Sequence, residues 1–317
     1  MRRSEALTAG PPSRRLVVGF LIDWDAAQRT RIAALCPHGI EPVFLGASPE
    51  TPVAMAPLDA VVVGTAPVAA RLLDGAPHLR FVQRWGTGFD NIDPAYLRAR
   101  GLSFAELPGI NARSVSEFVL LAILALLRHL PETVSAWSRG EWSPAPASLP
   151  PRRLQGKTVG LLGFGAIGRD LARLLEPFEV EILFHDIERT IPPGSAARWA
   201  DKTELLRCSD VVTVQLPLTE ATRGAIGARE IAGMKPSAIL VSIARAGVVD
   251  EAEVRAAVSE GRIAGASFDN FAVEPLPAEA IFQQPGILAT PHIGGASIEG
   301  FEALIGACFE SILSRCA

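Results

Sequence analysis

The sequence predicts an α/β protein with two doubly wound parallel-sheet domains. Short apolar runs alternate with longer amphipathic runs along the whole chain, which is typical of βαβ units. The length of 317 residues is more than one small core holds and indicates about two domains. A proline-rich stretch over residues 137–156 interrupts the alternation, which then starts again, so this stretch is expected to be a surface connection.

The first part of the chain predicts five strands followed by a long helix. Apolar runs bounded by turn residues place the strands at 16–22, 41–46, 59–64, 80–84 and 102–107. Helical spacing predicts helices at about 25–35 and 67–74, and a long helix at about 113–130. Because the long helix is apolar on nearly every side, we expect it to be buried on several faces. Its uninterrupted apolar run, 118–127, is too short to span a membrane, which takes about 20 residues.

The second part of the chain predicts six more strands, each followed by a helix or a loop. They are expected at 158–163, 179–186, 210–216, 238–244, 263–269 and 286–290. Strands that alternate with helices in this way form a parallel sheet with helices on both faces.

The composition excludes several classes of protein. A net charge of −4 argues against nucleic acid or an acidic membrane as the main partner. Hydrophobic residues make up 49% of the chain and charged residues 20%, as in globular proteins. The four cysteines are scattered without a Cys-x-x-Cys pair, which favours neither a metal site nor a disulfide framework. With no secretory signal visible at the N-terminus, the sequence favours a cytoplasmic location.

A glycine-rich loop after the strand at 158–163 indicates a dinucleotide site. Gly163, Gly165 and Gly168 form G-x-G-x-x-G, helical spacing follows from Ala166, and Asp186 closes the next strand. The first glycine allows the turn, the second a close approach of the pyrophosphate, and the third close helix–strand packing. Phosphates bind the free N–H groups of such a helix N-terminus. Asp186 can accept both ribose hydroxyls and would repel a 2′-phosphate, so NAD is favoured over NADP, although the nearby Arg189 weakens this preference.

Ionisable residues follow the later strands, at the sheet edge where ligands of open α/β sheets bind. Arg245 follows the strand at 238–244, Asp269 ends the strand at 263–269 with Glu274 five residues on, and His292 follows the strand at 286–290. An arginine binds a carboxylate and a polarised carbonyl, and a histidine carries a proton near neutral pH. A carboxylate beside the imidazole stabilises its charged form. These groups suit hydride transfer between a nicotinamide and a 2-oxo or 2-hydroxy acid.

Each residue also has a simpler explanation when taken alone. Arg245 could be a solvated loop residue, Glu274 a turn residue before a proline, and His292 a cap on local backbone. However, all three residues occur at consecutive strand ends beside a dinucleotide loop, which argues against three unrelated incidental roles.

The motifs together resemble the D-isomer-specific 2-hydroxyacid dehydrogenase family over residues 60–300. The matching segments, in family order, are RWGTGFDNID (84–93), NARSVSEFVLLAILALLR (111–128), GLLGFGAIGRDLA (160–172), QLPLTEATRGAIG (215–227), SIARAGVVDE (242–251), FDNFAVEPLP (268–277) and TPHIGGAS (290–297). The resemblance implies a Rossmann-type NAD-binding domain, residues 106–295, and a flavodoxin-like substrate domain formed by residues 1–105 and 296–317. It also implies a homodimer through the NAD-binding domain, with Trp137 and Trp142 as candidate interface residues or merely packing.

The resemblance further implies the roles of individual residues. Arg245, Glu274 and His292 would be the catalytic trio. The expected cofactor contacts are Gly163, Gly165, Ala166, Ile167, Gly168, Asp186, Leu216, Pro217, Thr222, Ile243, Ala244, Arg245, Asp269, His292 and Gly294. The expected substrate contacts are Trp85, Gly86, Thr87, Gly88 and Arg245, with a small 2-oxo or 2-hydroxy acid as substrate and no metal.

Several positions depart from the family pattern without removing a charged catalytic group. Ala246, Ser242, Asn270 and Gln215 replace the common Gly, Asn, aliphatic residue and His. The segment 63–70 lacks the arginine of phosphoglycerate-type members, which makes a phosphorylated substrate less favoured. Two other functions stay open at this point: an NAD-sensing scaffold like the corepressors built on this fold, and a phosphite-type dehydrogenase.

Overall fold

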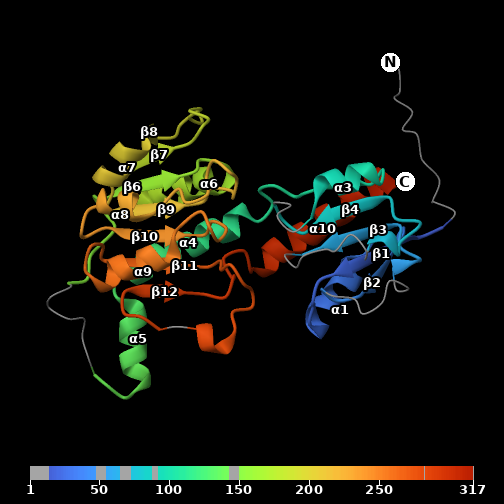
Figure 1. Ribbon diagram of the computed structural model, residues 1–317, viewed down its shortest axis with the longest axis horizontal. Coiled ribbons are helices and arrows are strands. Elements are labelled where there is room, and N and C mark those ends of the chain that lie inside the picture. Colours follow the sequence, from blue (N-terminus) through green and yellow to red (C-terminus); the bar gives the residue numbers. More distant parts are fainter. Residues whose placement is uncertain are drawn as a thin grey trace. The chain divides into compact units, whose positions relative to one another are not determined.

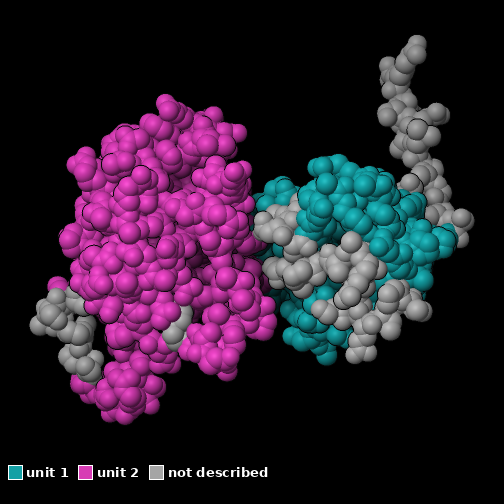
Figure 2. Space-filling model, viewed as in Figure 1, with its two compact units in different colours: residues 1–111, 298–317 teal, residues 112–297 magenta. Residues whose placement is uncertain are grey.

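The chain folds into two compact units. The computed structural model describes residues 14–47, 55–64, 73–87, 92–142, 150–281 and 283–316. Unit 1 comprises residues 1–111 and 298–317, and unit 2 comprises residues 112–297 (Figures 1 and 2). The units therefore change over at 111/112 and 297/298, against 105/106 and 295/296 in the sequence-based expectation.

Unit 1 contains a five-stranded parallel sheet in the order β2-β1-β3-β4-β5. This is the strand order of flavodoxin-like folds, as expected. The strands are β1 (Leu16–Leu21), β2 (Ile40–Phe44), β3 (Ala60–Val63), β4 (Phe81–Arg84) and β5 (Ser103–Ala105). The helices are α1 (Ala26–Leu35), α3 (Pro94–Ala99) and α10 (Ile298–Cys316).

Helices cover both faces of this sheet. One core joins Val18, Phe20 and Val62 to α10, so the C-terminal helix packs on strands from the other end of the chain. The opposite core joins Val61 and Val82 to residues that include Leu97 of α3. Residues 67–72 of the helix expected at 67–74 lie outside the described residues.

Unit 2 contains a seven-stranded parallel sheet in the order β12-β11-β10-β9-β6-β7-β8. From β8 onward this is the doubly wound order of dinucleotide-binding sheets, in which the direction of winding reverses between β6 and β9. The strands are β6 (Thr158–Leu162), β7 (Glu181–His185), β8 (Arg198–Trp199), β9 (Val211–Val214), β10 (Ile239–Ser242), β11 (Gly265–Phe268) and β12 (Ile287–Ala289). The fold class predicted from the sequence is confirmed.

The helices of unit 2 form two layers. They are α4 (Ala112–Leu127), α5 (Leu130–Ser138), α6 (Ala166–Leu175), α7 (Lys202–Cys208), α8 (Ala228–Ala232) and α9 (Glu251–Ser259), with short 3₁₀ turns η2 (Glu176–Phe178) and η3 (Ala278–Ala280). Buried residues of α4 and α6 pack on Leu161 and Val211, and those of α7, α8 and α9 pack on Leu162 and Val212. Successive residues of one strand thus face opposite helical layers, as the period of a strand requires.

The long helix expected at about 113–130 is α4, which ends three residues earlier, at Leu127, and a second helix, α5, begins at Leu130. His129 between them has a left-handed backbone (φ 51°), and Pro131 lies in the first turn of α5, where a missing N–H costs nothing. Within the described residues, no single helix is long and apolar enough to cross a membrane, and α4 with α5 meets that test only as a pair bent by 71°.

Candidate active site

The glycine-rich loop lies between β6 and α6, at the point where the sheet reverses its winding. Gly163 has a φ of 100°, a conformation that favours glycine. Gly165 caps α6 without a side-chain hydrogen bond. A β-carbon on Gly165 would meet no protein atom within 4 Å, whereas one on Gly168 would overlap the carbonyl oxygen of Gly163. Ala166 and Ile167 lie between Gly165 and Gly168 and begin the first turn of α6.

These positions fit a bound dinucleotide. The open space at Gly165 admits a phosphate close to the backbone, and the N-terminal N–H groups of α6 are arranged to bind it. Gln215, directly after β9, donates from Nε2 to the carbonyl oxygen of Gly163 over 2.7 Å. It therefore braces the loop from the neighbouring strand, a role that sequence reasoning missed.

Asp186 follows β7 and is fixed by two backbone groups. Its Oδ2 accepts a hydrogen bond from the N–H of Phe164 (2.6 Å), and its Oδ1 accepts one from the N–H of Glu188 (3.0 Å). The guanidinium of Arg189 stacks over the indole of Trp199, 3.9 Å from the ring centroid. The Asp186 carboxylate thus lies against the glycine-rich loop, whereas the Arg189 guanidinium lies over the Trp199 ring.

Further expected cofactor contacts follow strands β9 and β10. Leu216, Pro217 and Thr222 lie in the loop after β9, where Thr222 Oγ1 donates to the carbonyl oxygen of Pro217. Ile243 and Ala244 follow β10, and Ala244 is buried. Because β9 and β10 are neighbours in the parallel sheet, both loops leave the same edge as the glycine-rich loop.

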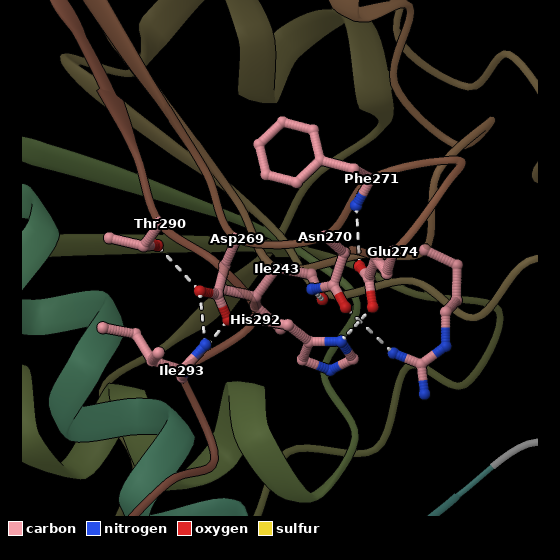
Figure 3. A network of polar contacts seen from close by, with 10 residues as sticks. Ile243, Asp269, Asn270, Phe271, Glu274, Thr290, His292 and Ile293 are labelled. Atoms are coloured by element: carbon pink, nitrogen blue, oxygen red, sulfur yellow. Dashed lines mark hydrogen bonds and ion pairs between the residues drawn. The ribbon is translucent and has the colours of Figure 1, made fainter. Parts of the chain in front are cut away.

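His292 and Glu274 form a close pair. His292 Nδ1 lies 2.6 Å from Glu274 Oε2, and Glu274 Oε1 accepts a hydrogen bond from the N–H of Phe271 over 2.8 Å (Figure 3). The imidazole is 35% exposed and the Glu274 side chain 25% exposed, so the pair faces solvent only in part. This contact leaves Nε2, on the other side of the ring, to exchange a proton with a ligand.

Asp269 holds the loop that carries His292. It is only 2% exposed, and its Oδ1 accepts hydrogen bonds from Thr290 Oγ1 (2.7 Å) and the N–H of Ile293 (2.8 Å), while Oδ2 accepts one from the N–H of Gly294 (2.7 Å) (Figure 3). A β-carbon on Gly294 would lie 2.8 Å from Asp269 Oδ2, so glycine permits this approach. His292 itself has a left-handed backbone with a φ of 54°.

Arg245 joins the same network through Asn270. Arg245 Nη1 donates to Asn270 Oδ1 over 3.3 Å, and Asn270 Nδ2 donates to the carbonyl oxygen of Ile243 over 3.3 Å. The structure therefore brings Arg245, Glu274 and His292 into one set of linked contacts at the carboxyl ends of β10, β11 and β12. Asn270 and Thr290 were not among the residues predicted for the site.

Apart from Arg245, the expected substrate residues belong to unit 1. Gly86 has a φ of 89° and its carbonyl oxygen accepts a hydrogen bond from the N–H of Leu107 over 2.9 Å. Trp85 packs edge-on against Trp24 (ring centroids 5.0 Å apart) and lies 5.4 Å from the Phe301 ring. The Trp85 side chain thus contributes to an aromatic cluster. Thr87 ends the described segment, and Gly88 lies outside the described residues.

Metal ligands are not gathered anywhere in the part of the chain that the structure describes: no group of three or more His, Cys, Asp or Glu side chains could hold an ion. The four cysteines are free thiols.

Comparison with known proteins identifies relatives of the chain. A model of the D-isomer specific 2-hydroxyacid dehydrogenase NAD binding domain matches residues 120–294. A glyoxylate reductase from Thermofilum pendens is 36% identical over 240 residues, which are 73% of this chain and 70% of the relative. A hydroxypyruvate reductase from Thermotoga maritima is 34% identical over 250 residues, 76% of this chain and 79% of the relative.

Solved structures extend the likeness to the whole fold. The NADPH-dependent glyoxylate/hydroxypyruvate reductase from Sinorhizobium meliloti, solved in complex with NADP and malonate, is 27% identical. The match covers 95% of this chain and 93% of that chain, with a TM-score of 0.80.

Proposed function

The chain belongs to the D-isomer-specific 2-hydroxyacid dehydrogenases, a family of NAD(P)-dependent oxidoreductases, and we propose that it transfers a hydride between NADH and C2 of a small, unphosphorylated 2-oxo acid. The observation that carries this proposal is the 2.6 Å contact between His292 Nδ1 and Glu274 Oε2, which is linked to Arg245 through the consecutive residues Phe271 and Asn270. A proton donor, its acidic neighbour and a guanidinium are the groups that this reaction needs from the protein.

His292 is the proposed acid and base. The contact of Nδ1 with Glu274 directs Nε2 toward the reacting oxygen. In the direction of reduction, the imidazolium donates its Nε2 proton to the oxygen that becomes the hydroxyl, and Glu274 stabilises the charged ring beforehand. In the direction of oxidation, neutral His292 accepts the hydroxyl proton at Nε2 while keeping the proton on Nδ1.

Arg245 is the proposed binding group for the substrate carboxylate and carbonyl oxygen. A guanidinium presents parallel N–H donors that match a carboxylate, and it stays charged throughout the working pH range. Backbone N–H groups of the turn that includes Gly86 and Thr87 would provide further donors to the carboxylate, as the family resemblance implies. The nicotinamide, when bound, supplies or accepts the hydride at C2.

NAD is the proposed cofactor, supported by the position of Asp186. Its carboxylate is fixed against the glycine-rich loop by the N–H groups of Phe164 and Glu188. A fixed negative charge there accepts hydrogen bonds from the ribose hydroxyls and repels a 2′-phosphate. The stacking of Arg189 on Trp199 supports the same preference, because its charge is engaged on the indole.

A homodimer through the NAD-binding domain is supported by exposed apolar side chains on α5 and just after it. Val134, Trp137 and Trp142 are 57%, 68% and 87% exposed. Figure 1 shows α5 extending away from the sheet of unit 2. Such side chains are usually covered by a partner. Sedimentation analysis of the wild type and of Val134→Glu tests this: a wild-type monomer contradicts the dimer, and the charged variant is expected to dissociate it.

The experiment that tests the function is a substrate panel with both cofactors. Glyoxylate, hydroxypyruvate, pyruvate and bulkier 2-oxo acids are offered with NADH and, separately, with NADPH, and oxidation of the nicotinamide is followed. We expect turnover of at least one small 2-oxo acid with a preference for NADH. Folded protein that binds NADH but turns over none of these acids would contradict the proposal.

A further inference from the structure

Three consecutive residues at the end of β11 each hold a different part of the candidate active site. Asp269 binds the N–H groups that follow His292, and the N–H of Phe271 binds Glu274 (Figure 3). Between them, Asn270 binds Arg245. The segment 269–271 therefore binds the Arg245 and Glu274 side chains directly and the backbone that follows His292, and Asn270 is the residue that binds the arginine.

The side chain of Asn270 bridges two points of one short segment. Its Oδ1 accepts from Arg245 Nη1, and its Nδ2 donates to the carbonyl oxygen of Ile243, each over 3.3 Å. Since a guanidinium only donates and a carbonyl only accepts, this pair of partners admits one orientation of the amide. The Ile243 carbonyl thereby anchors the amide, and the amide oxygen sets the position of the guanidinium.

The amide suits this task better than its nearest alternatives. An aliphatic residue at position 270 offers neither contact. An aspartate keeps an acceptor for Arg245, but it loses the donor to Ile243 and adds a negative charge that competes with an anionic substrate for the guanidinium. Asparagine fixes the guanidinium without adding charge. A long side chain held in place before binding loses less freedom when a substrate carboxylate arrives.

We propose that Asn270 is a positioning residue, which preorients Arg245 for the carboxylate of the 2-oxo acid. The inference rests on the proposed function of Arg245 and deepens it. It assigns to a neutral residue part of the affinity for the anionic substrate.

Steady-state kinetics of three variants test the inference. Asn270→Val should raise the KM for the 2-oxo acid about ten-fold and change kcat by less than about three-fold, as expected for lost substrate binding. Asn270→Asp should raise KM at least as much, although it preserves the size and shape of the side chain. The dissociation constant for NADH should stay unchanged in both. Ser267→Ala is the control and should match the wild type: it is a buried change in β11, three residues before Asn270, and the Ser267 hydroxyl has no hydrogen-bond partner within the described residues.

A purely structural role predicts a different pattern. Asn270→Asp would then behave as the wild type, or kcat, kcat/KM and the melting temperature would fall together in the variants. Either result would overturn the inference.

A double variant separates the two proposals. If Asn270 acts through Arg245, adding Asn270→Val to Arg245→Ala should lower kcat/KM no further than Arg245→Ala alone. A further loss of about ten-fold would show that Asn270 acts independently and would overturn the inference. If Arg245→Ala keeps the wild-type kcat/KM, the proposed role of Arg245 fails instead.

A readout without turnover completes the test. In a crystal structure of Asn270→Val, the Arg245 guanidinium should leave its wild-type position or spread over several. An unchanged guanidinium would overturn the inference whatever the activity of the enzyme.

Discussion

His292 and Glu274 meet through a 2.6 Å contact between Nδ1 and Oε2, and further hydrogen bonds hold the Glu274 side chain and the backbone that follows His292. Glu274 is also bound by the N–H of Phe271, and the residues after His292 are bound by Asp269. Both partners are thus anchored to the end of β11, so their mutual orientation is set before any ligand arrives.

Replacing His292 by alanine should abolish most of the activity and leave the cofactor site intact. Loss of a general acid lowers turnover by about 10²- to 10⁴-fold. The glycine-rich loop and Asp186 are untouched, so NADH should bind with near-normal affinity in a fluorescence titration. Undiminished turnover would remove His292 from the proposed mechanism.

Two glycines of the dinucleotide loop should respond differently to alanine. A β-carbon on Gly165 meets no protein atom within 4 Å, so Gly165→Ala should keep its melting temperature but weaken NADH binding about ten-fold or more, because the methyl group fills space beside the pyrophosphate. A β-carbon on Gly168 overlaps the Gly163 carbonyl, so Gly168→Ala should lose about 1–3 kcal/mol of unfolding free energy as well. Equal melting temperatures for the two variants would contradict this distinction.

The preference for NADH over NADPH should depend on Asp186. Asp186→Ala removes the carboxylate that faces the glycine-rich loop, so we expect NADH binding to weaken about ten-fold or more. The dissociation constants for NADH and NADPH should therefore become more similar. Glu188→Gln is the matched control, because that side chain is 74% exposed and lies two residues after Asp186 in the sequence. The dissociation constants for both cofactors are measured in each variant. If their ratio in Asp186→Ala equals that of the wild type, Asp186 does not determine the preference for NADH.

Glu230 should make stability depend on pH at the acidic end. Burial by itself would raise the pKa of this carboxyl group, but hydrogen bonds from Arg229 and Lys202 and the charge of Lys202 outweigh it, and the pKa is lowered from 4.5 to about 2. A pKa lowered in the folded state stabilises the protein above the unfolded value, and this contribution is lost as the pH falls from about 4.5 to about 2.

Denaturant unfolding of Glu230→Gln checks this. The variant should lose on the order of 2 kcal/mol at neutral pH, allowing for the solvent exposure of both cations, and the difference from the wild type should vanish near the acidic limit. Glu260→Gln, which breaks an exposed pair with Arg262, should change the unfolding free energy by less than about 1 kcal/mol. A pH-independent difference for Glu230→Gln would contradict the linkage.

Much of the fold could be predicted because buried parallel strands leave continuous apolar runs. All four residues of β3 and of β9 are buried, and both strands lie inside their predicted ranges. Strand β8 left no such signal, since it has two residues at the edge of the sheet and Arg198 is exposed. Helix α5 was not predicted: helical spacing continues past the end of α4, so the predicted helix ran to about 130, and Pro131 was the local sign of a new helix.

The proposed site residues likewise divide into those that the sequence could predict and those that it could not. Arg245, Glu274 and His292 could be singled out because their side chains carry acid, base or charge chemistry at strand ends. Asn270 and Gln215 were visible only as departures from the family pattern. Their partners are backbone carbonyls on neighbouring strands, at Ile243 and Gly163. Such contacts depend on strand order and register, which local sequence patterns do not specify.

At position 292 the proposed chemistry requires an imidazole, whereas the left-handed backbone of this residue favours glycine. A β-carbon at this φ costs about 1 kcal/mol, and glycine is the residue that avoids the cost. His292→Gly should therefore be at least as stable as His292→Ala, the reverse of the usual order for these two residues. The residue proposed to carry the proton is thus not the one that best fits this backbone conformation, and a descendant of this protein that no longer needed the imidazole would gain stability here with glycine.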